Sequence, residues 1–246
     1  MKKFMALLLV AGMTLSLTAC GGSTDTAKTD QADGKDTFTV GFDQDFPPFG
    51  YVGDDGEFTG FDIEMATECA ARMGKKIVLQ PIDWDAKDME LEAGTIDCIW
   101  NGFTMNGRED QYTWTDPYMD NSQVVVVKKD SGINTLADLA GKVVEVQKES
   151  AAETALNDEE HADLMASFAQ LLSVGEYNTA FMDLESGAVD AVAIDIGVAQ
   201  FQIEGKEDQY QILDETISSE QYAVGFFLGN TALRDEVQST LLEMVE

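Results

Sequence analysis

Two charges of opposite sign, Arg108 and Asp195, stand where they could hold a small charged molecule. Arg108 is one of only 15 Lys and Arg residues against 46 Asp and Glu, and it lies in IDCIWNGFTMNGRED, where a strand-like apolar run changes to polar turn residues. A guanidinium binds a carboxylate through two parallel hydrogen bonds, and an aspartate accepts hydrogen bonds from an ammonium group. A free amino acid carries both groups and would satisfy the pair.

Both charges follow apolar runs that read as buried strands, which end at Trp100 and Ile194. Ligands of open α/β sheets sit beyond the carboxyl ends of the strands. We therefore expect one half of the molecule to present backbone amides, a hydroxyl group and the guanidinium, and the other half to present the carboxylate. The residues expected beside Arg108 are Asn101, Gly102 and Thr104.

Each charge also has a simpler interpretation. Arg108 could form a surface ion pair with Glu109 or Asp110, and Asp195 could be the N-cap of a helix that begins with IGVAQF. A helix cap can also contact a ligand, so the two roles of Asp195 are compatible. The spacing of these residues alone leaves both interpretations open.

Strand patterns that alternate with helical patterns predict an α/β fold. FTVGF (residues 38–42) and KIVLQPI (76–82) read as strands, whereas FDIEMATECAARMG (61–74) has apolar residues at helical spacing and a glycine as its stop signal. Such alternation favours mostly parallel sheets flanked by helices.

An internal echo indicates that this unit occurs twice. ELEAGTIDCIW (90–100) and DLESGAVDAVA (183–193) both read as a helix end, a glycine, an aspartate and an apolar strand. We therefore predict two lobes joined by a hinge of two strands, SQVVVVKKD (122–130) and EQYAVGFFLG (220–229). The predicted lobes contain residues 37–127 plus 222–246 and residues 128–221.

Residues 1–20 read as a secretory leader. Lys2 and Lys3 precede an apolar run too short to span a membrane, and the run ends at LTAC, which resembles the lipobox of bacterial lipoproteins. We expect lipidation at Cys20, followed by a flexible linker over residues 21–36. The exported protein would then be anchored on the outer face of the bacterial cytoplasmic membrane. An ordinary leader with an incidental cysteine is the alternative.

The composition of the 246-residue chain excludes some partners. Its formal net charge of −31 would repel nucleic acid. Cys69, Cys98 and the single His161 form no pattern of metal ligands, and we predict neither a metal nor a cofactor. Export permits a disulfide between Cys69 and Cys98, but both lie in buried patterns, so bridged and free thiols stay open. The chain ends inside an amphipathic helix pattern, which we interpret as a shortened C-terminus.

Four stretches in order resemble the extracellular solute-binding proteins of polar amino-acid ABC importers. They are FDQDFPPFGYVGDDGEFTGFDIEMA (42–66), IDCIWNGFTMNGREDQYTWTDPY (96–118), VEVQKESAAE (144–153) and VDAVAID (189–195). The resemblance covers nearly everything from residue 38 to the end. It implies a two-lobed periplasmic-binding-protein-like fold of type II, with a hinge of two strands.

The resemblance also implies a role for each site residue. Aromatic residues that sandwich the ligand side chain in this family correspond to Phe46 and Trp84, and Asn101 adds polarity to that pocket. Asp195 corresponds to the residue that binds the ammonium group. The residues expected at the α-carboxylate are Gly102, Thr104, Arg108 and a helix N-terminus near Ser150. The aromatic, glycine and threonine positions would equally suit ordinary core, turn and cap roles.

The sequence departs from the family in two places. The spacing between Thr104 and Arg108 is one residue shorter than usual, which requires a tighter turn that Gly107 could permit through a positive φ. Glu149 and Ala151 also stand where the family commonly has Gly and Ser. A hydroxyl group is thereby lost, and Glu149 would either repel a carboxylate or face solvent.

The family resemblance and the lipobox together indicate a monomeric, tethered receptor. It would capture a free amino acid between its lobes, close about the hinge and deliver the ligand to the permease subunits of an ABC importer. No catalytic residue is assigned. The alternatives are an amino-acid sensor or signalling ectodomain of the same fold, and a periplasmic dehydratase-like enzyme, which would need a carboxylic acid poised for proton transfer.

Overall fold

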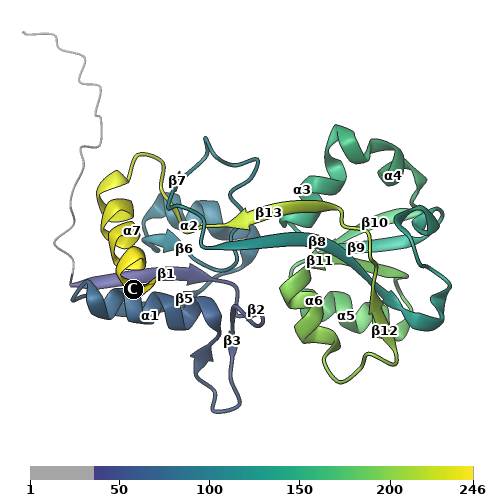
Figure 1. Cartoon of the computed structure of the whole chain (residues 1–246), viewed down its shortest axis with the longest axis horizontal. Helices are drawn as coiled ribbons and strands as arrows, with labels where there is room; N and C mark the ends of the chain where they lie inside the picture. The colour runs from purple at the N-terminus through teal and green to yellow at the C-terminus, as the bar shows by residue number, and fades with distance from the viewer. Residues whose placement is uncertain (1–35, 246) are drawn as a thin grey trace, which may run out of the picture.

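The computed structural model describes residues 36–245 and contains two α/β halves joined by long strands (Figure 1). The predicted leader with Cys20, and the predicted linker as far as residue 35, lie outside the described residues. None of the helices within residues 36–245 has both the length and the apolar character that a membrane span requires.

The first half is built on a five-stranded sheet in the order β5-β1-β6-β14-β7. β1 pairs in parallel with β5 and β6, whereas β14 is antiparallel to β6 and β7. The strands are β1 (Thr37–Phe42), β5 (Lys76–Pro81), β6 (Cys98–Ile99), β7 (Thr113–Trp114) and β14 (Gly225–Phe226). The other elements are β2 (Asp45–Phe46), β3 (Gly50–Val52), β4 (Phe58–Thr59), α1 (Phe61–Arg72), η1 (Trp84–Ala86), α2 (Lys87–Ala93) and α7 (Thr231–Val245).

The second half has a six-stranded sheet in the order β10-β9-β11-β8-β12, and β13 pairs with β8. β9 is parallel to β10 and β11, whereas β8 is antiparallel to its three partners. The strands are β8 (Met119–Lys128), β9 (Val143–Gln147), β10 (Gln170–Val174), β11 (Ala191–Asp195), β12 (Tyr210–Ile212) and β13 (Ser218–Tyr222). The helices are η2 (Lys129–Ser131), η3 (Leu136–Leu139), α3 (Ala151–Asn157), η4 (Glu159–His161), α4 (Ala162–Ser167), α5 (Tyr177–Ser186) and α6 (Ile196–Ile203).

The internal echo corresponds to the same structural unit in each half. α2 and α5 both end at a glycine in the left-handed conformation, Gly94 at φ 71° and Gly187 at φ 81°. α2 leads to β6, which is parallel to β1, and α5 leads to β11, which is parallel to β9. The echoed aspartates, Asp97 and Asp190, accept hydrogen bonds from backbone N–H groups of β1 and β9, at 2.7 and 2.9 Å. The echo therefore reflects a repeated local architecture.

The two halves are connected through β8 and β13, which run antiparallel beside each other (Figure 1). The expected boundary at residues 127–128 falls at the end of β8, yet every partner of β8 belongs to the second sheet. The expected single strand at 220–229 is two strands: β13 pairs with β8, and β14 joins the first sheet. This pairing moves our proposed lobe boundaries to about residues 119 and 223.

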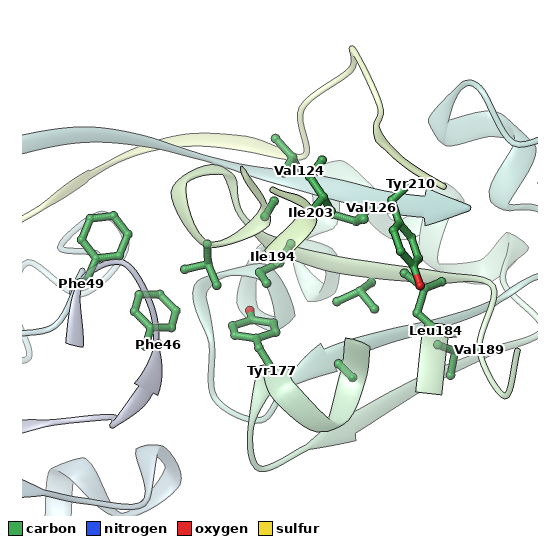
Figure 2. Packing of buried hydrophobic residues seen from close by; sticks show 14 of the residues in the cluster. Phe46, Phe49, Val124, Val126, Tyr177, Leu184, Val189, Ile194, Ile203 and Tyr210 are labelled. Carbon is green, nitrogen blue, oxygen red and sulfur yellow. The ribbon is translucent and has the colours of Figure 1, made fainter. Parts of the chain in front are cut away.

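One apolar cluster extends from the second half into the first. Phe46 and Phe49 of the first half belong to the same buried cluster as Tyr177 and Ile194 of the second half (Figure 2). The ring centroids of Phe46 and Tyr177 are 6.1 Å apart. Gly197 on α6 leaves space for Phe49, because a Cβ at that position would lie 2.9 Å from the phenyl ring. The halves are therefore packed against each other beside the cavity described next.

Candidate functional site

A cavity between the two halves is lined by all eight residues that the sequence predicted for the ligand site. Those from the first half are Phe46, Trp84, Asn101, Gly102, Thr104 and Arg108, and those from the second half are Ser150 and Asp195. Asp43, Gln147 and Ala151 complete the lining. The structure thus brings the whole predicted set to one place.

Arg108 lines this cavity and is only 9% exposed, so its guanidinium does not extend into bulk solvent. Its Nη1 donates to the carbonyl of Thr104 at 3.1 Å, and its Nη2 donates to the carbonyl of Glu149 at 3.4 Å. The guanidinium carbon lies 5.5 Å from the ring centroid of Phe103. Among residues 36–245 Arg108 forms no salt bridge, so the surface ion pair considered above is absent.

A tight turn holds Arg108 in this position. Gly107 has φ 77°, a conformation that other residues rarely adopt, as the shortened spacing required. The backbone N–H of Arg108 donates to the carbonyl of Met105 at 2.9 Å, and the carbonyl of Arg108 accepts from Nε1 of Trp114 at 3.0 Å. The backbone of Arg108 is therefore held at both its N–H and its carbonyl group.

Asp62 of α1 anchors the loop that carries Gly102. Its carboxylate is fully buried and accepts from the N–H of Gly102 at 2.5 Å and from the hydroxyl of Tyr118 at 2.9 Å. Burial raises the pKa of Asp62 from 3.8 to about 7. The family resemblance implied that the Gly102 N–H would donate to the ligand carboxylate. In the structure this N–H donates to Asp62 and is not available to a ligand.

Asp195 is the acidic residue that the second half contributes to the lining of the cavity. It occupies the N-cap position of α6 but makes no side-chain cap hydrogen bond. Its Oδ1 accepts from three side chains at 2.6–2.7 Å, namely Asn121, Gln123 and Tyr222. Burial, and next the charge of Glu220, raise the pKa of Asp195 from 3.8 to about 7. The helix-cap interpretation therefore does not account for this residue.

The hydroxyl of Thr104 donates to Glu220 Oε1 at 2.8 Å. A threonine hydroxyl has one hydrogen and two lone pairs, so Thr104 is left as an acceptor on its remaining side. An acceptor suits an ammonium group better than it suits a carboxylate, which reverses the role that the resemblance implied for this hydroxyl.

Ser150 and Glu149 lie at the start of α3. Ser150 is the N-cap, and its hydroxyl accepts from the N–H of Glu153 at 3.1 Å. Glu149 has φ 57°, and its carboxylate forms a 2.9 Å ion pair with Lys87 of the first half. Lys87 is 3% exposed. Glu149 therefore does not line the cavity: its side chain is 45% exposed, which agrees with the solvent-facing alternative, and it also connects the two halves through Lys87.

Two aromatic residues border the cavity from the first half. Trp84 is 9% exposed and meets Phe103 edge to face, with centroids 5.5 Å apart. Phe46 is 6% exposed and lies in β2. Both rings are supported by other aromatic side chains, so they form firm apolar walls.

Asp43 and Gln147 line the cavity but were missed by the sequence reasoning. Gln147 Nε2 donates to Asp43 Oδ2 at 2.6 Å, a contact between the two halves. Asn101 Oδ1 accepts from the N–H of Asp43 at 2.6 Å, and burial raises the pKa of Asp43 from 3.8 to about 6. Asp43 directly follows β1 and Gln147 ends β9. The strand-end rule would have found both if it had been applied to every strand.

Cys69 and Cys98 are both buried free thiols. Burial raises the pKa of Cys69 to about 12 and that of Cys98 well above its ordinary value. Neither thiol lines the cavity. The sequence left open whether Cys69 and Cys98 form a disulfide, and in the structure they do not.

The fold and the interlobe site define a class of protein. A Streptococcus pneumoniae ABC uptake transporter substrate-binding protein with bound histidine matches at a TM-score of 0.81 and 32% identity, over 86% of this chain and 87% of that chain. Such structures have the type II periplasmic-binding-protein fold, which is also the fold of this chain.

Sequence comparisons give the family. The model for bacterial extracellular solute-binding proteins, family 3, matches residues 38–246, so the chain belongs to that family. L-cystine-binding protein TcyJ of Escherichia coli (strain K12) is 30% identical over 98% of this chain and 87% of its own length. Arginine-binding extracellular protein ArtP of Bacillus subtilis (strain 168) is 29% identical over 99% of this chain and 93% of its own length. The family consists of binding proteins that work outside the cytoplasm.

Proposed function

We propose that this protein binds a free amino acid between its two lobes and delivers it to an ABC importer. The observation that carries the proposal is the placement of Arg108 and Asp195 on opposite halves of one cavity. An amino acid is a zwitterion that needs a cation and an anion held at a fixed separation. The histidine-bound, cystine-binding and arginine-binding relatives support the same ligand class.

The charges of the site give the ligand an orientation. The α-carboxylate is bound by the guanidinium of Arg108, with Ser150 at the start of α3 beside it. The ammonium group is bound by Asp195 and by the hydroxyl oxygen of Thr104, whose hydrogen is donated to Glu220. Each end of the ligand thus meets groups of the opposite polarity.

The remaining lining favours a ligand side chain that donates hydrogen bonds. Phe46 and Trp84 supply apolar walls, and beyond them Asp43 supplies a buried carboxylate beside Asn101 and Gln147. A carboxylate accepts hydrogen bonds and attracts positive charge. Asp43→Asn keeps the size of this group and removes its charge, so it should weaken binding of L-arginine at least tenfold and binding of L-glutamine threefold or less.

Three or four charge-assisted hydrogen bonds of roughly 1.5–3 kcal/mol each, together with aromatic burial, offset the entropic cost of association. We expect a Kd of about 1 μM, which is a binding free energy of about −8 kcal/mol.

We assign the protein no catalytic role. We propose that it is a monomer on the outer face of the cytoplasmic membrane and that a lipidated Cys20 anchors it there. Mass spectrometry of the protein extracted from membranes should find a diacylated Cys20 at its N-terminus. An unmodified Cys20 would remove the anchor from this proposal and leave the binding site unaffected.

Isothermal titration calorimetry of the intact protein with the twenty standard amino acids and L-cystine tests the function. At least one should bind with a Kd near 1 μM, and Asp195→Asn should weaken that binding at least 30-fold. Asp190→Asn, which alters the echoed aspartate outside the cavity, is the matched control and should leave Kd within twofold. No detectable binding of any amino acid would refute the proposed function.

A further inference from the structure

A second buried carboxylate, Glu220, lies beside Asp195 at the ammonium end of the proposed site. Glu220 is 7% exposed and Asp195 is 4% exposed. Asn121 Nδ2 donates to Asp195 Oδ1 and to Glu220 Oε1, both at 2.7 Å, and Gln123 Nε2 donates to the same two oxygens at 2.7 Å. Because each amide nitrogen lies 2.7 Å from both oxygens, Asp195 Oδ1 and Glu220 Oε1 can be separated by no more than twice 2.7 Å.

The side chains that donate hydrogen bonds to this acidic pair are uncharged, and Arg108 of the same cavity donates to the backbone carbonyl of Thr104 and not to either carboxylate. Within residues 36–245 neither carboxylate forms an ion pair with a lysine or arginine. The titratable neighbours are tyrosines whose pKa values burial raises well above 10, so they stay neutral: Tyr222 on β13, Tyr177 on α5, and Tyr118 before β8, which faces Tyr222. The other donors are the hydroxyl of Thr104 and the amides of Asn121 and Gln123.

Neutral donors cannot neutralise two adjacent negative charges in a buried place. A negative charge this close opposes the ionisation of Asp195, and burial penalises the charged form of Asp195. The raised pKa of Asp195, about 7, agrees with this geometry. In a coupled pair of this kind one proton is shared by both carboxylates, and it is held at pH values below the raised pKa of Asp195.

We propose that Asp195 and Glu220 hold one proton between them in the free protein, and that the ammonium group of the bound amino acid displaces it. The inference rests on the proposed function, which supplies the ammonium group. The carboxylic O–H bond breaks, its electron pair stays on oxygen, and the proton passes to solvent. The ammonium group keeps its three N–H bonds.

Glu220 acts in this scheme as a positioning residue. It does not line the cavity, and it contacts the ligand site through Thr104, whose hydroxyl it turns into an acceptor. It also shares both amide donors with Asp195. Glu220 therefore sets the proton content of the ammonium subsite without touching the ligand.

Ligand affinity should depend on pH in one direction. Above pH 7 the pair has already lost its proton, and the ammonium group binds without displacing anything. At pH 6 about one proton must leave per ligand bound, so Kd should be about tenfold weaker than at pH 8. Proton release should fall from about one per ligand at pH 6 to nearly none at pH 8.

The test is calorimetry of the intact protein at pH 6 in phosphate and in imidazole buffer, whose ionisation enthalpies differ. The probes are the twenty standard amino acids and L-cystine, and each binder is titrated in both buffers at pH 6 and pH 8. Glu220→Gln keeps the size and an acceptor for Thr104 but removes one charge. It should release fewer protons than the wild type at pH 6 and lose part of the tenfold pH dependence, because burial still raises the pKa of Asp195 once the charge of Glu220 is gone. Asp43 is unchanged in this variant and does not contribute to the difference.

Glu145→Gln is the matched control, because Glu145 is a buried carboxylate of β9 outside the cavity, with a pKa also raised by burial. It should release protons like the wild type. Binding by the wild type with equal heats in both buffers at pH 6 would overturn the inference and leave the proposed function intact, whether or not Glu220→Gln folds. Unchanged proton release in a folded Glu220→Gln variant would also overturn it. Absence of binding by every probe would overturn the proposed function, and this inference with it.

Discussion

Replacement of Arg108 by lysine isolates the geometry of the guanidinium from its charge. The guanidinium is nearly buried, and its two terminal nitrogens donate to the carbonyls of Thr104 and Glu149 from opposite halves. Lysine retains the positive charge but has no planar fork, so it cannot bind a carboxylate with two parallel hydrogen bonds while it also reaches those carbonyls.

The expected loss follows from the number of hydrogen bonds removed. One charge-assisted hydrogen bond to the ligand carboxylate contributes roughly 1.5–3 kcal/mol, and about 1.4 kcal/mol corresponds to a tenfold change in Kd. Arg108→Lys should therefore weaken ligand binding about 10- to 150-fold. Loss of the donors to Thr104 and Glu149 should lower the free energy of unfolding by about 1–3 kcal/mol.

Calorimetric Kd values and urea unfolding curves of wild type and variant measure these two effects separately. Arg72→Lys is the matched control, because Arg72 forms an exposed i,i+4 pair with Glu68 on α1 and lies outside the cavity. Its Kd should stay within twofold of the wild type. A folded Arg108→Lys protein that binds within threefold of the wild type would refute the assignment of the α-carboxylate to this guanidinium.

Three further predictions concern other parts of the molecule. Lys87→Met removes the interlobe ion pair with Glu149 and should weaken ligand binding about two- to tenfold by calorimetry, whereas an unchanged Kd would mean that the pair does not support closure. Burial raises the pKa of Asp62 to about 7 from 3.8, so protonated Asp62 stabilises the fold below pH 4 and this contribution is lost as pH rises through 7. Asp62→Asn should therefore gain up to about 4 kcal/mol relative to the wild type between pH 4 and pH 8 in unfolding experiments, and a constant difference would contradict this. Cys69 and Cys98 should react with a chromogenic thiol reagent only on unfolding, and rapid reaction in the native protein would show that they are accessible.

The local architecture was predictable wherever the signal was local. The glycines that end α2 and α5 and the strands that follow them are encoded within a few residues of each other, so the echo could be read directly. Arg108 and Asp195 were found by the same logic, since Arg108 lies in the loop after the buried strand β6 and Asp195 is the last residue of the buried strand β11. Gly107 could also be anticipated, because the short spacing left the turn few alternatives.

Features that depend on pairing across the chain were not predictable in the same way. The apolar run in β8 is compatible with either sheet, and only its partners β11, β12 and β13 assign it to the second one. Glu220 is 116 residues from Thr104 and lies in a strand whose apolar pattern continues into β14. Nothing local indicates that its side chain turns toward Asp195. The ion pair between Lys87 and Glu149 has the same character, because it exists only when the halves face each other.

The central claim is that charges of opposite sign on the two lobes hold the two charges of an amino acid. The most direct measurement compares calorimetric binding of the tightest-binding amino acid with that of its carboxamide, which lacks the carboxylate, and of its α-hydroxy acid, which lacks the ammonium group. Each analogue should bind at least 100-fold more weakly than the amino acid, because each leaves Arg108 or Asp195 without its partner. Binding of either analogue within tenfold of the amino acid would contradict the account.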